Sequence, residues 1–175
     1  MTASVELRGP ACVVRSYRPD DAASLALHGN DRAVWLNLRD AFPHPYRMED
    51  GAAYIARATA MDPQLSFAIE VGGSAVGGIS LHKGVDVERF GAELGYWLGA
   101  PFWGRGITTA AVRLVSAYAF ETCGLERVFA MPYARNAASA RVLEKAGFVR
   151  EGVLRRHAFK DGVFEDQWLY ATLRK

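Results

Sequence analysis

The amino-acid sequence predicts an α+β fold with α/β layering, in which helices flank a mixed, largely antiparallel sheet. Strand-like apolar runs and amphipathic stretches of helical period succeed one another along the whole chain. Two pairs of strand-like runs are joined by tight turns, at Gly72-Gly73 and at Asp161-Gly162, which are typical of β-hairpins. The resulting order is one strand, two helices, three strands, a helix, a strand, a helix and two strands.

The first half of the chain supplies one strand, two helices and then three strands. The first helix has Pro19 and two aspartates at its start and Gly29-Asn30 just past its end. Two prolines in "DAFPHPY" favour a loop or an extended segment there. The expected segments are a strand over 11–20 that runs into a turn, helices over 19–30 and 48–61, and strands over 65–71, 74–82 and 90–99.

The second half begins with the clearest helix in the sequence. From Gly104 onward, apolar residues recur at helical spacing from Ile107 to Ala119, and the pattern ends near Cys123-Gly124. A second helix is expected to be capped by Asn136 and to end at Gly147. The remaining segments are a strand over 126–133, that capped helix over 136–147, and a closing hairpin of 152–160 and 163–173.

Composition sets the broad class of the protein. The 175 residues are half hydrophobic, and no repeat, low-complexity stretch or composition break divides them, so we expect one domain over 1–175. A formal net charge of only +2, without a basic block, argues against nucleic acid as a partner. Two distant cysteines, Cys12 and Cys123, fit a reducing compartment. No signal-peptide core or membrane-length run occurs, so we expect a cytoplasmic protein with no membrane contact.

The stretch "PFWGRGITTAAVRL", with its two glycines around one arginine, raises the question of a phosphate site. A P-loop would begin at Gly99, but Arg105 stands where its lysine belongs and Gly106 where its hydroxyl belongs. A dinucleotide-binding GxGxxG pattern fits Gly104 and Gly106 but meets Thr109 in place of its third glycine. Both of these nucleotide-binding patterns are therefore weak.

A general anion site remains. The unpaired N–H groups of a helix's first turn bind anions, and Gly104 and Gly106 leave the backbone accessible there. Arg105 adds a positive charge. The structural alternative is a glycine-rich turn that only joins a strand to a helix, and the residues by themselves leave both interpretations open.

Two motifs together resemble the GNAT superfamily of N-acetyltransferases, in particular its Rim-type branch of ribosomal-protein N-terminal acetyltransferases. They are "GYWLGAPFWGRGITTAA" and "NAASARVLEKAGF", and the resemblance extends from about Ala11 to Leu173. The superfamily motif Q/R-x-x-G-x-G/A falls on Trp103 to Thr108 and keeps Gly106 as its fixed glycine. Trp103 and Thr108 depart from the motif, although Trp103 is common in the Rim-type branch.

The resemblance implies a GNAT fold and acetyl-CoA as the acetyl donor, with no metal. It implies that the pyrophosphate rests on backbone N–H groups of residues 104–109, and that the pantetheine runs along the open edge of "YWLG". The amide of Asn136 could also hold the pantetheine arm. The cofactor-binding residues implied in this way are Trp97, Leu98, Gly99, Trp103, Gly104, Arg105, Gly106, Ile107, Thr108, Thr109, Asn136 and Ser139.

Glu93 is the first candidate for the catalytic base. It lies in the middle of a strand, on the same side as Gly95 and Trp97 by alternation. A buried acid in an apolar strand is costly, and burial would raise its pKa toward a useful range. The alternative is an edge or bulge carboxylate paired with an arginine.

Ser139 is the candidate for the group that protonates the leaving thiolate. Many GNAT enzymes use a helix tyrosine, whose position corresponds to Leu143 here, whereas Rim-type enzymes have serine at the position of Ser139. Asn136 and Ser139 share a helix face, but both also suit simple roles as N-cap and first-turn residue.

Other candidates are weaker. The glutamate that some Rim-type enzymes use in the closing hairpin corresponds to Ala158, and nothing aligns the nearby Glu165 or Asp166 with a base. Tyr133 is expected to pack. The loop containing His44 should border the acceptor site in this fold, where Trp35, Phe42 and Tyr46 could shape a pocket, although a solvent-facing histidine and core aromatics are the simpler interpretation.

The sequence therefore predicts an acetyl-CoA-dependent N-acetyltransferase that transfers acetyl directly, since neither cysteine has a nucleophile's setting. A protein or peptide α-amine is the favoured acceptor. A cationic small amine, such as a polyamine or an aminoglycoside, would favour a more acidic pocket than this balanced sequence indicates. An amino acid as acceptor and a non-catalytic acyl-CoA-binding domain remain alternatives. Homodimers are common in the family, but the sequence does not predict the oligomeric state.

Overall fold

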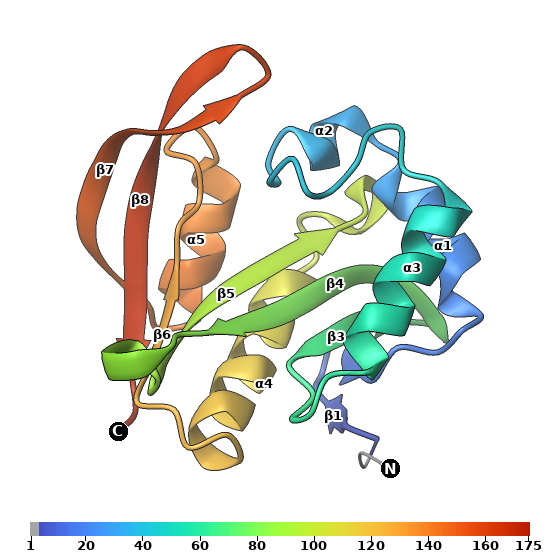
Figure 1. The fold of residues 1–175 in the computed structure, drawn as a ribbon, viewed down its shortest axis with the longest axis horizontal. Helices are drawn as coiled ribbons and strands as arrows, with labels where there is room; N and C mark the ends of the chain where they lie inside the picture. Colours follow the sequence, from blue (N-terminus) through green and yellow to red (C-terminus); the bar gives the residue numbers. More distant parts are fainter. Residues whose placement is uncertain (1–3) are drawn as a thin grey trace.

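The computed structural model describes residues 4–175 and contains one eight-stranded sheet in the order β1-β2-β3-β4-β5-β6-β8-β7 (Figure 1). Neighbouring strands are antiparallel except for β5 and β6, which are parallel. The predicted α+β fold with a mixed, largely antiparallel sheet is therefore confirmed. The elements are β1 (Glu6–Arg8), β2 (Val13–Arg15), α1 (Asp21–Gly29), α2 (Arg32–Trp35), α3 (Met48–Thr59), β3 (Ser66–Val71), β4 (Ser74–Lys83), β5 (Gly91–Leu98), α4 (Ile107–Glu121), β6 (Arg127–Ala130), α5 (Ala137–Lys145), β7 (Val149–Lys160) and β8 (Val163–Leu173).

Every predicted helix and strand is present, and a short strand, a short α-helix and two 3-10 helices, Asp86–Glu88 and Ala100–Phe102, accompany them. Strand β1 has three residues and helix α2 has four, which is too short for a periodic pattern to reveal. The strand expected over 11–20 is confined to β2, and β1 pairs with it at the edge of the sheet. The predicted hairpin turns are confirmed, with Gly72 and Gly73 both at positive φ between β3 and β4.

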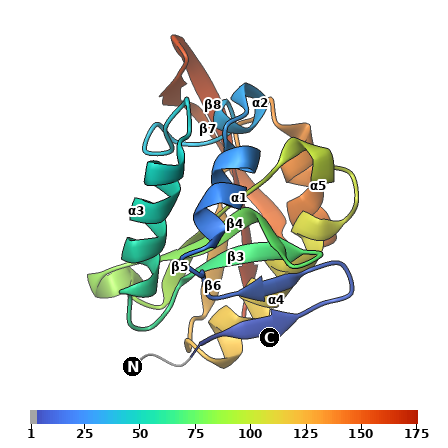
Figure 2. The same cartoon turned by 90° about the vertical axis from the view of Figure 1, so that its right-hand side faces the viewer.

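The helices form layers on the two faces of the sheet (Figure 2). On one face, α4 contributes Ala111, Val112 and Val115 to a core with the central strands. On the other face, α1 and α3 pack through Leu25 and Ile55 in a second, smaller cluster. The central strands are thus covered by helices on both faces.

A buried ion cluster fixes α1 against the sheet. Arg15 on β2 is almost fully buried and donates two hydrogen bonds of 2.8 Å to the carboxylate of Asp21, the first residue of α1. It also bonds to Glu70 on β3. Burial by itself would raise the pKa of Asp21, but hydrogen bonds from Arg15 and from the Arg18 N–H, with the charges of both arginines, lower it below its usual range. The cluster therefore stays ionised and ties three elements together.

The sheet opens between its two central parallel strands. Strand β5 pairs with β6 only over Gly91, Ala92 and Glu93. Beyond Glu93, β5 continues to Leu98 paired with β4 alone, while β6 follows β8. One edge of β5 is therefore left without a neighbouring strand over its last five residues.

Candidate active site

A cavity of about 790 Å³ lies where β5 separates from β6. Its walls come from both halves of the chain: α1, the segment between α2 and α3, strands β4 and β5, the turn before α4, and the start of α5. The predicted site residues that line it are Glu93, Trp97, Leu98, Trp103, Gly104, Thr108, Asn136 and Ser139. Gly99, Arg105, Gly106, Ile107 and Thr109 do not line this cavity.

The turn before α4 has the conformation expected of an anion-binding turn. Gly104 and Gly106 adopt φ values of +73° and +75°, in the left-handed region that favours glycine. A Cβ at either position would meet no atom within 4 Å, so both face open space. Gly106 is the N-cap of α4 and provides no side-chain cap, which leaves the first N–H groups of the helix without a capping partner. Arg105 beside them is exposed.

The side chain of Ile107 is not available to a ligand. The residue is 3% exposed and belongs to the core under α4. The resemblance implies that Ile107 binds the cofactor, and its burial leaves the N–H group as the part for which that role stays a prediction. Thr108, by contrast, is half-buried and lines the cavity, although its position in the family motif is usually glycine or alanine.

The open edge of β5 differs from the prediction at Gly99, which the resemblance placed among the residues that bind the cofactor. The Gly99 N–H donates to the Val76 carbonyl at 2.9 Å, so it belongs to the β4 side and is not available to a ligand. Because backbone groups alternate along a strand, the Leu98 N–H faces the open edge. A Cβ at Gly99 would lie 2.8 Å from the Cβ of His28, so glycine here accommodates α1 rather than a ligand.

Trp103 holds the turn against the end of β5. Its indole Nε1 donates to the Leu98 carbonyl at 2.7 Å, while the ring remains 47% exposed. This contact joins the open strand edge to the glycine turn. It gives a structural reason for tryptophan at the motif position that elsewhere in the superfamily is Gln or Arg.

Glu93 lies at the point where the sheet opens, and it is paired with an arginine. Nη2 of Arg39 lies 2.6 Å and 2.8 Å from the two carboxylate oxygens of Glu93. The arginine partner that the alternative interpretation expected is therefore present, and the role of Glu93 as a base stays a prediction. Glu93 is nevertheless in a central strand rather than at an edge, because β4 and β6 flank it at His82 and Phe129. Its side chain is 20% exposed, toward the cavity.

Tyr96 is a site residue that the sequence reasoning missed. Its hydroxyl lies 2.6 Å from Ser139 Oγ, which joins β5 to the first turn of α5. Burial raises the pKa of Tyr96 far above its usual range despite the hydrogen bond to Ser139, so the phenol stays protonated. Leu143, at the position of the usual family tyrosine, is fully buried. Alternation along β5 could have revealed Tyr96, since it faces α5 while Glu93 faces the other side.

Asn136 has the predicted capping role. Its Oδ1 accepts a 3.1 Å hydrogen bond from the Ser139 N–H, as an N-cap does. Both Asn136 and Ser139 also line the cavity. The cap and the Tyr96 contact together fix Ser139 from two sides.

Aromatic side chains form the wall on the α1 and α3 side. Phe42 stacks on Tyr46 at 4.5 Å and lies 5.3 Å from Trp97 between ring centroids. Burial raises the pKa of Tyr46 to about 12, so this wall carries no charge from its phenol near neutral pH. Phe42 and Tyr46 line the cavity and also pack with the second core cluster, so both interpretations hold for them, whereas Trp35 and His44 stack on each other and do not line it.

The remaining candidates are engaged elsewhere. Glu165 pairs with Arg135 at 2.7 Å, and Asp166 accepts from the Arg156 N–H at 2.7 Å; neither lines the cavity. Tyr133 is buried and packs, as expected, although it also lines the cavity. Burial raises the pKa of the Cys12 thiol to about 11, which disfavours a thiolate nucleophile.

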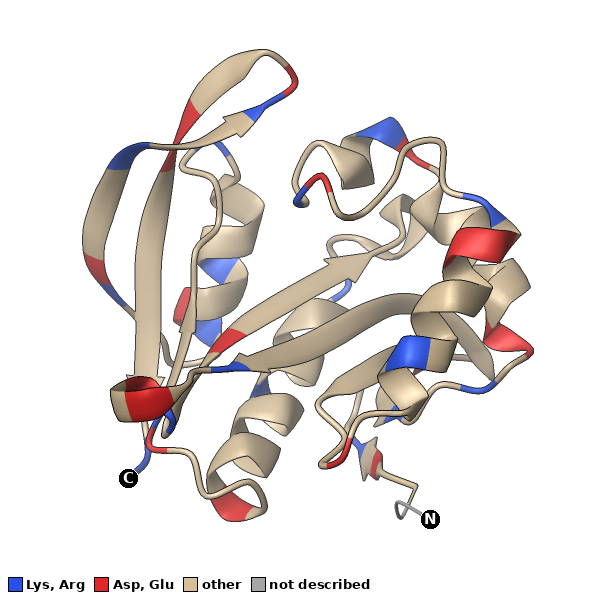
Figure 3. Ribbon diagram, in the orientation of Figure 1, with Lys and Arg blue, Asp and Glu red and all other residues tan. Residues whose placement is uncertain are grey.

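Charge and metal-ligating groups are dispersed over the molecule. Acidic and basic segments are interspersed along the ribbon, in keeping with the small net charge (Figure 3). Within residues 4–175, no three His, Cys, Asp or Glu side chains gather as a metal site would require. Over the same range, no helix combines the length and the apolar character of a membrane span.

A protein-family model described as "Acetyltransferase (GNAT) domain" matches residues 12–149. The chain belongs to the GNAT acetyltransferase family. Its fold agrees with that assignment: an acetyltransferase of this family from Bacillus anthracis superposes with a TM-score of 0.84 at 20% identity, over 97% of this chain and 98% of that one. The predicted GNAT fold is therefore confirmed, and members of this family use acetyl-CoA.

Relatives with higher identity include a CoA complex and a protein acetyltransferase. RimJ of Mycobacterium smegmatis, in complex with CoA-disulfide, has a TM-score of 0.82 at 26% identity and covers 97% of this chain and 86% of its own. "Probable N-acetyltransferase YjcK" of Bacillus subtilis is 43% identical over 98 residues, 56% of this chain and 54% of that protein. The ribosomal-protein-serine acetyltransferase of Escherichia coli is 30% identical over 82 residues, 47% of this chain and 46% of that protein. The chain thus spans about half the length of the curated relatives it matches.

Replacing Gly106 by alanine tests the turn before α4. A left-handed φ costs an alanine about 1 kcal/mol, so Gly106→Ala should lower the free energy of unfolding by about that amount. The new Cβ would also stand where an anion approaches, so affinity for CoA should fall roughly tenfold, as titration calorimetry would measure.

Gly124→Ala is the matched control. Gly124 follows α4 with φ +64° and equally open surroundings, but it lies beyond the other end of the helix. The control should show the same loss in urea unfolding with unchanged CoA affinity. Equal CoA affinities for the two variants would contradict a ligand role for the Gly106 turn.

Proposed function

We propose that this chain transfers an acetyl group directly from acetyl-CoA to a primary amine, and that the acceptor is the N-terminal α-amine of a protein or peptide. The observation that carries the proposal is the opening between β5 and β6, where one cavity contains a hydroxyl pair on one side and a carboxylate on the other. Family membership supports the donor, because GNAT enzymes use acetyl-CoA. When bound, acetyl-CoA would supply a thioester as the acyl source.

The donor would bind across the turn and the open strand edge. Backbone N–H groups of residues 104–109 suit a pyrophosphate, with the Arg105 charge beside them. The Leu98 N–H at the open edge of β5 suits the pantetheine amides, in the manner of an added strand, and Trp103 would flank it. Asn136 would contribute its amide from the start of α5.

Glu93 would receive the proton that the amine must lose before it attacks. The carboxylate projects from the sheet at the point of divergence and faces the cavity. An amine bound beside Glu93 would therefore approach the thioester from the α1 and α3 side. Direct transfer needs no enzyme nucleophile, which agrees with the raised pKa of the buried Cys12 thiol.

Ser139 would donate its hydroxyl proton to the thiolate as it leaves and regain a proton from solvent in the open cavity, with Tyr96 as its support. A hydroxyl that accepts a hydrogen bond from a neighbouring phenol is a better donor, because the chain of bonds polarises each member. Tyr96 would thus take the place of the helix tyrosine that Leu143 replaces. Its high pKa suits this role, because the phenol remains a donor across the physiological pH range.

A peptide α-amine is the acceptor that fits these features best. Its reference pKa of about 7.7–8.0, against about 10.4 for lysine, makes the α-ammonium much easier for a carboxylate base to deprotonate near pH 7. The near-balanced charge does not favour a polycationic acceptor. The ribosomal-protein-serine acetyltransferase among the relatives adds support for a protein acceptor.

Thiol release from acetyl-CoA with an amine panel tests the proposal. The panel holds short peptides with a free N-terminal Ser, Ala or Met, their N-blocked lysine-containing counterparts, polyamines, amino acids and an aminoglycoside. We expect release with the free N-termini and little with the blocked peptides. Release with a small amine alone would overturn the peptide assignment, and tight CoA binding without any release would favour a non-catalytic acyl-CoA-binding domain.

Ser139 and Tyr96 should act as one unit. Ser139→Ala should lower kcat by about a hundredfold, the lower end of the range for a general acid, with CoA affinity unchanged within twofold. Tyr96→Phe should lower kcat less, because Ser139 remains. In the double variant the rate should equal that of Ser139→Ala, whereas multiplicative losses would show that the two hydroxyls act independently.

A further inference from the structure

Residues 36–40 run from α2 toward the strands of the C-terminal half, and hydrogen bonds from that half hold them in place. Arg135, in the loop before α5, donates to the Leu36 carbonyl at 2.6 Å and to Asn37 Oδ1 at 2.9 Å. Lys160, at the end of β7, donates to Asp40 Oδ1 at 2.8 Å. We call residues 36–40 the bridge segment, because contacts from the C-terminal half hold it near both ends.

The Lys160 contact is unusually well buried for a lysine. The side chain is 1% exposed, and its ammonium lies 3.6 Å from the centroid of the Trp35 ring. The next residue, Asp161, pairs with Arg32 at 2.6 Å. The β7–β8 turn is therefore tied to α2, and the bridge segment between them has a defined path over the cavity.

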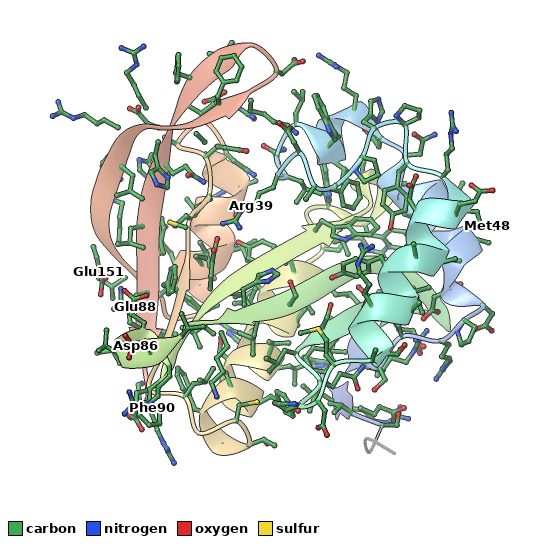
Figure 4. All side chains as sticks on the ribbon, viewed as in Figure 1. Arg39, Met48, Asp86, Glu88, Phe90 and Glu151 are labelled. Carbon is green, nitrogen blue, oxygen red and sulfur yellow. The ribbon has the colours of Figure 1, made fainter. Side chains whose placement is uncertain are left out.

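That path brings Arg39 to Glu93. Arg39 lines the cavity and extends from the bridge segment toward β5 (Figure 4). Its guanidinium bonds to both oxygens of Glu93, although 54 residues separate the two in sequence. The Arg39 side chain is 66% exposed, and within residues 4–175 its guanidinium forms an ion pair with Glu93 alone, the carboxylate that the proposed reaction uses. The Arg39 guanidinium thus occupies the position beside Glu93 where the ammonium group of an acceptor would bind.

We propose that Glu93 is the ammonium-binding group for the acceptor, and that Arg39 is an internal competitor which the acceptor's ammonium displaces. The inference rests on the proposed N-acetyltransferase function. Exchange of one cation for another keeps Glu93 paired throughout, which avoids the cost of leaving a partly buried carboxylate without a partner. Arg39 therefore sets the affinity for the amine and disfavours uncharged acceptors, which cannot replace it.

The test measures binding of a peptide with a free N-terminal serine to the enzyme saturated with CoA, where no acetyl group can be transferred. Arg39→Gln should tighten the Kd of this peptide by about two- to fivefold, the range expected for loss of an exposed competing ion pair. In turnover with acetyl-CoA, the KM for the peptide should fall similarly while kcat changes less than twofold. Arg39→Lys should lie between Arg39→Gln and the wild type.

Three controls separate displacement from a structural role. In a Glu93→Gln background, Arg39→Gln should leave the Kd unchanged, because the shared carboxylate is gone. The N-acetylated form of the peptide should bind all variants alike. Arg155→Gln removes an exposed arginine on β7 that forms no ion pair within residues 4–175, and it should leave the Kd unchanged.

Weaker or unchanged peptide binding in Arg39→Gln would overturn the proposal, since a residue that merely positions Glu93 would weaken binding when removed. If Arg39→Gln tightened peptide binding equally in the Glu93→Gln background, that result would overturn the proposal as well. Failure of the underlying function is a separate result, because it would appear in the wild-type enzyme as absence of thiol release with every amine.

Discussion

The short parallel pairing of β5 with β6 is the constraint on which the rest of the site depends. The two strands share register for three residues and then separate after Glu93. Had they stayed paired, the N–H and C=O groups of the last residues of β5 would be satisfied by β6, and no cavity would lie between them. Separation exposes one strand edge in the central part of the sheet, where helices cover both faces.

Because side chains alternate along β5, chemically different groups project from the two faces of the sheet. Glu93 and Trp97 project toward α1 and α3, where aromatic rings form an uncharged wall. Tyr96 projects the other way, to Ser139 at the start of α5. The Glu93 carboxylate and the Tyr96–Ser139 hydroxyl pair therefore reach the same opening from opposite sides. The proposed acetyl transfer uses this arrangement, with the carboxylate as base and a hydroxyl as acid.

Sequence reasoning succeeded where local chemistry decides the outcome. The glycine turn before α4, the Asn136 cap and the hairpin turns each depend on a few adjacent residues, and all three are confirmed. The contacts it missed join residues far apart in the chain, namely Arg39 with Glu93 and Tyr96 with Ser139. Alternation along β5 indicates which face each side chain takes, but not its partner, because the partner depends on how the bridge segment and α5 pack. The backbone of Gly99 was misassigned for a related reason, since its N–H direction depends on the register with β4.

Backbone hydrogen exchange, measured with and without CoA, tests most directly whether the donor occupies the opening of the sheet. We expect CoA to slow exchange at residues 104–109 and at the N–H of Leu98, while amides at the far end of α4 near Gly124 stay unchanged. The Gly99 N–H, already bonded to Val76, should show little change. Protection confined to other parts of the chain, with none at the α4 turn or at Leu98, would contradict the central claim that the separation of β5 from β6 creates the acetyl-CoA site.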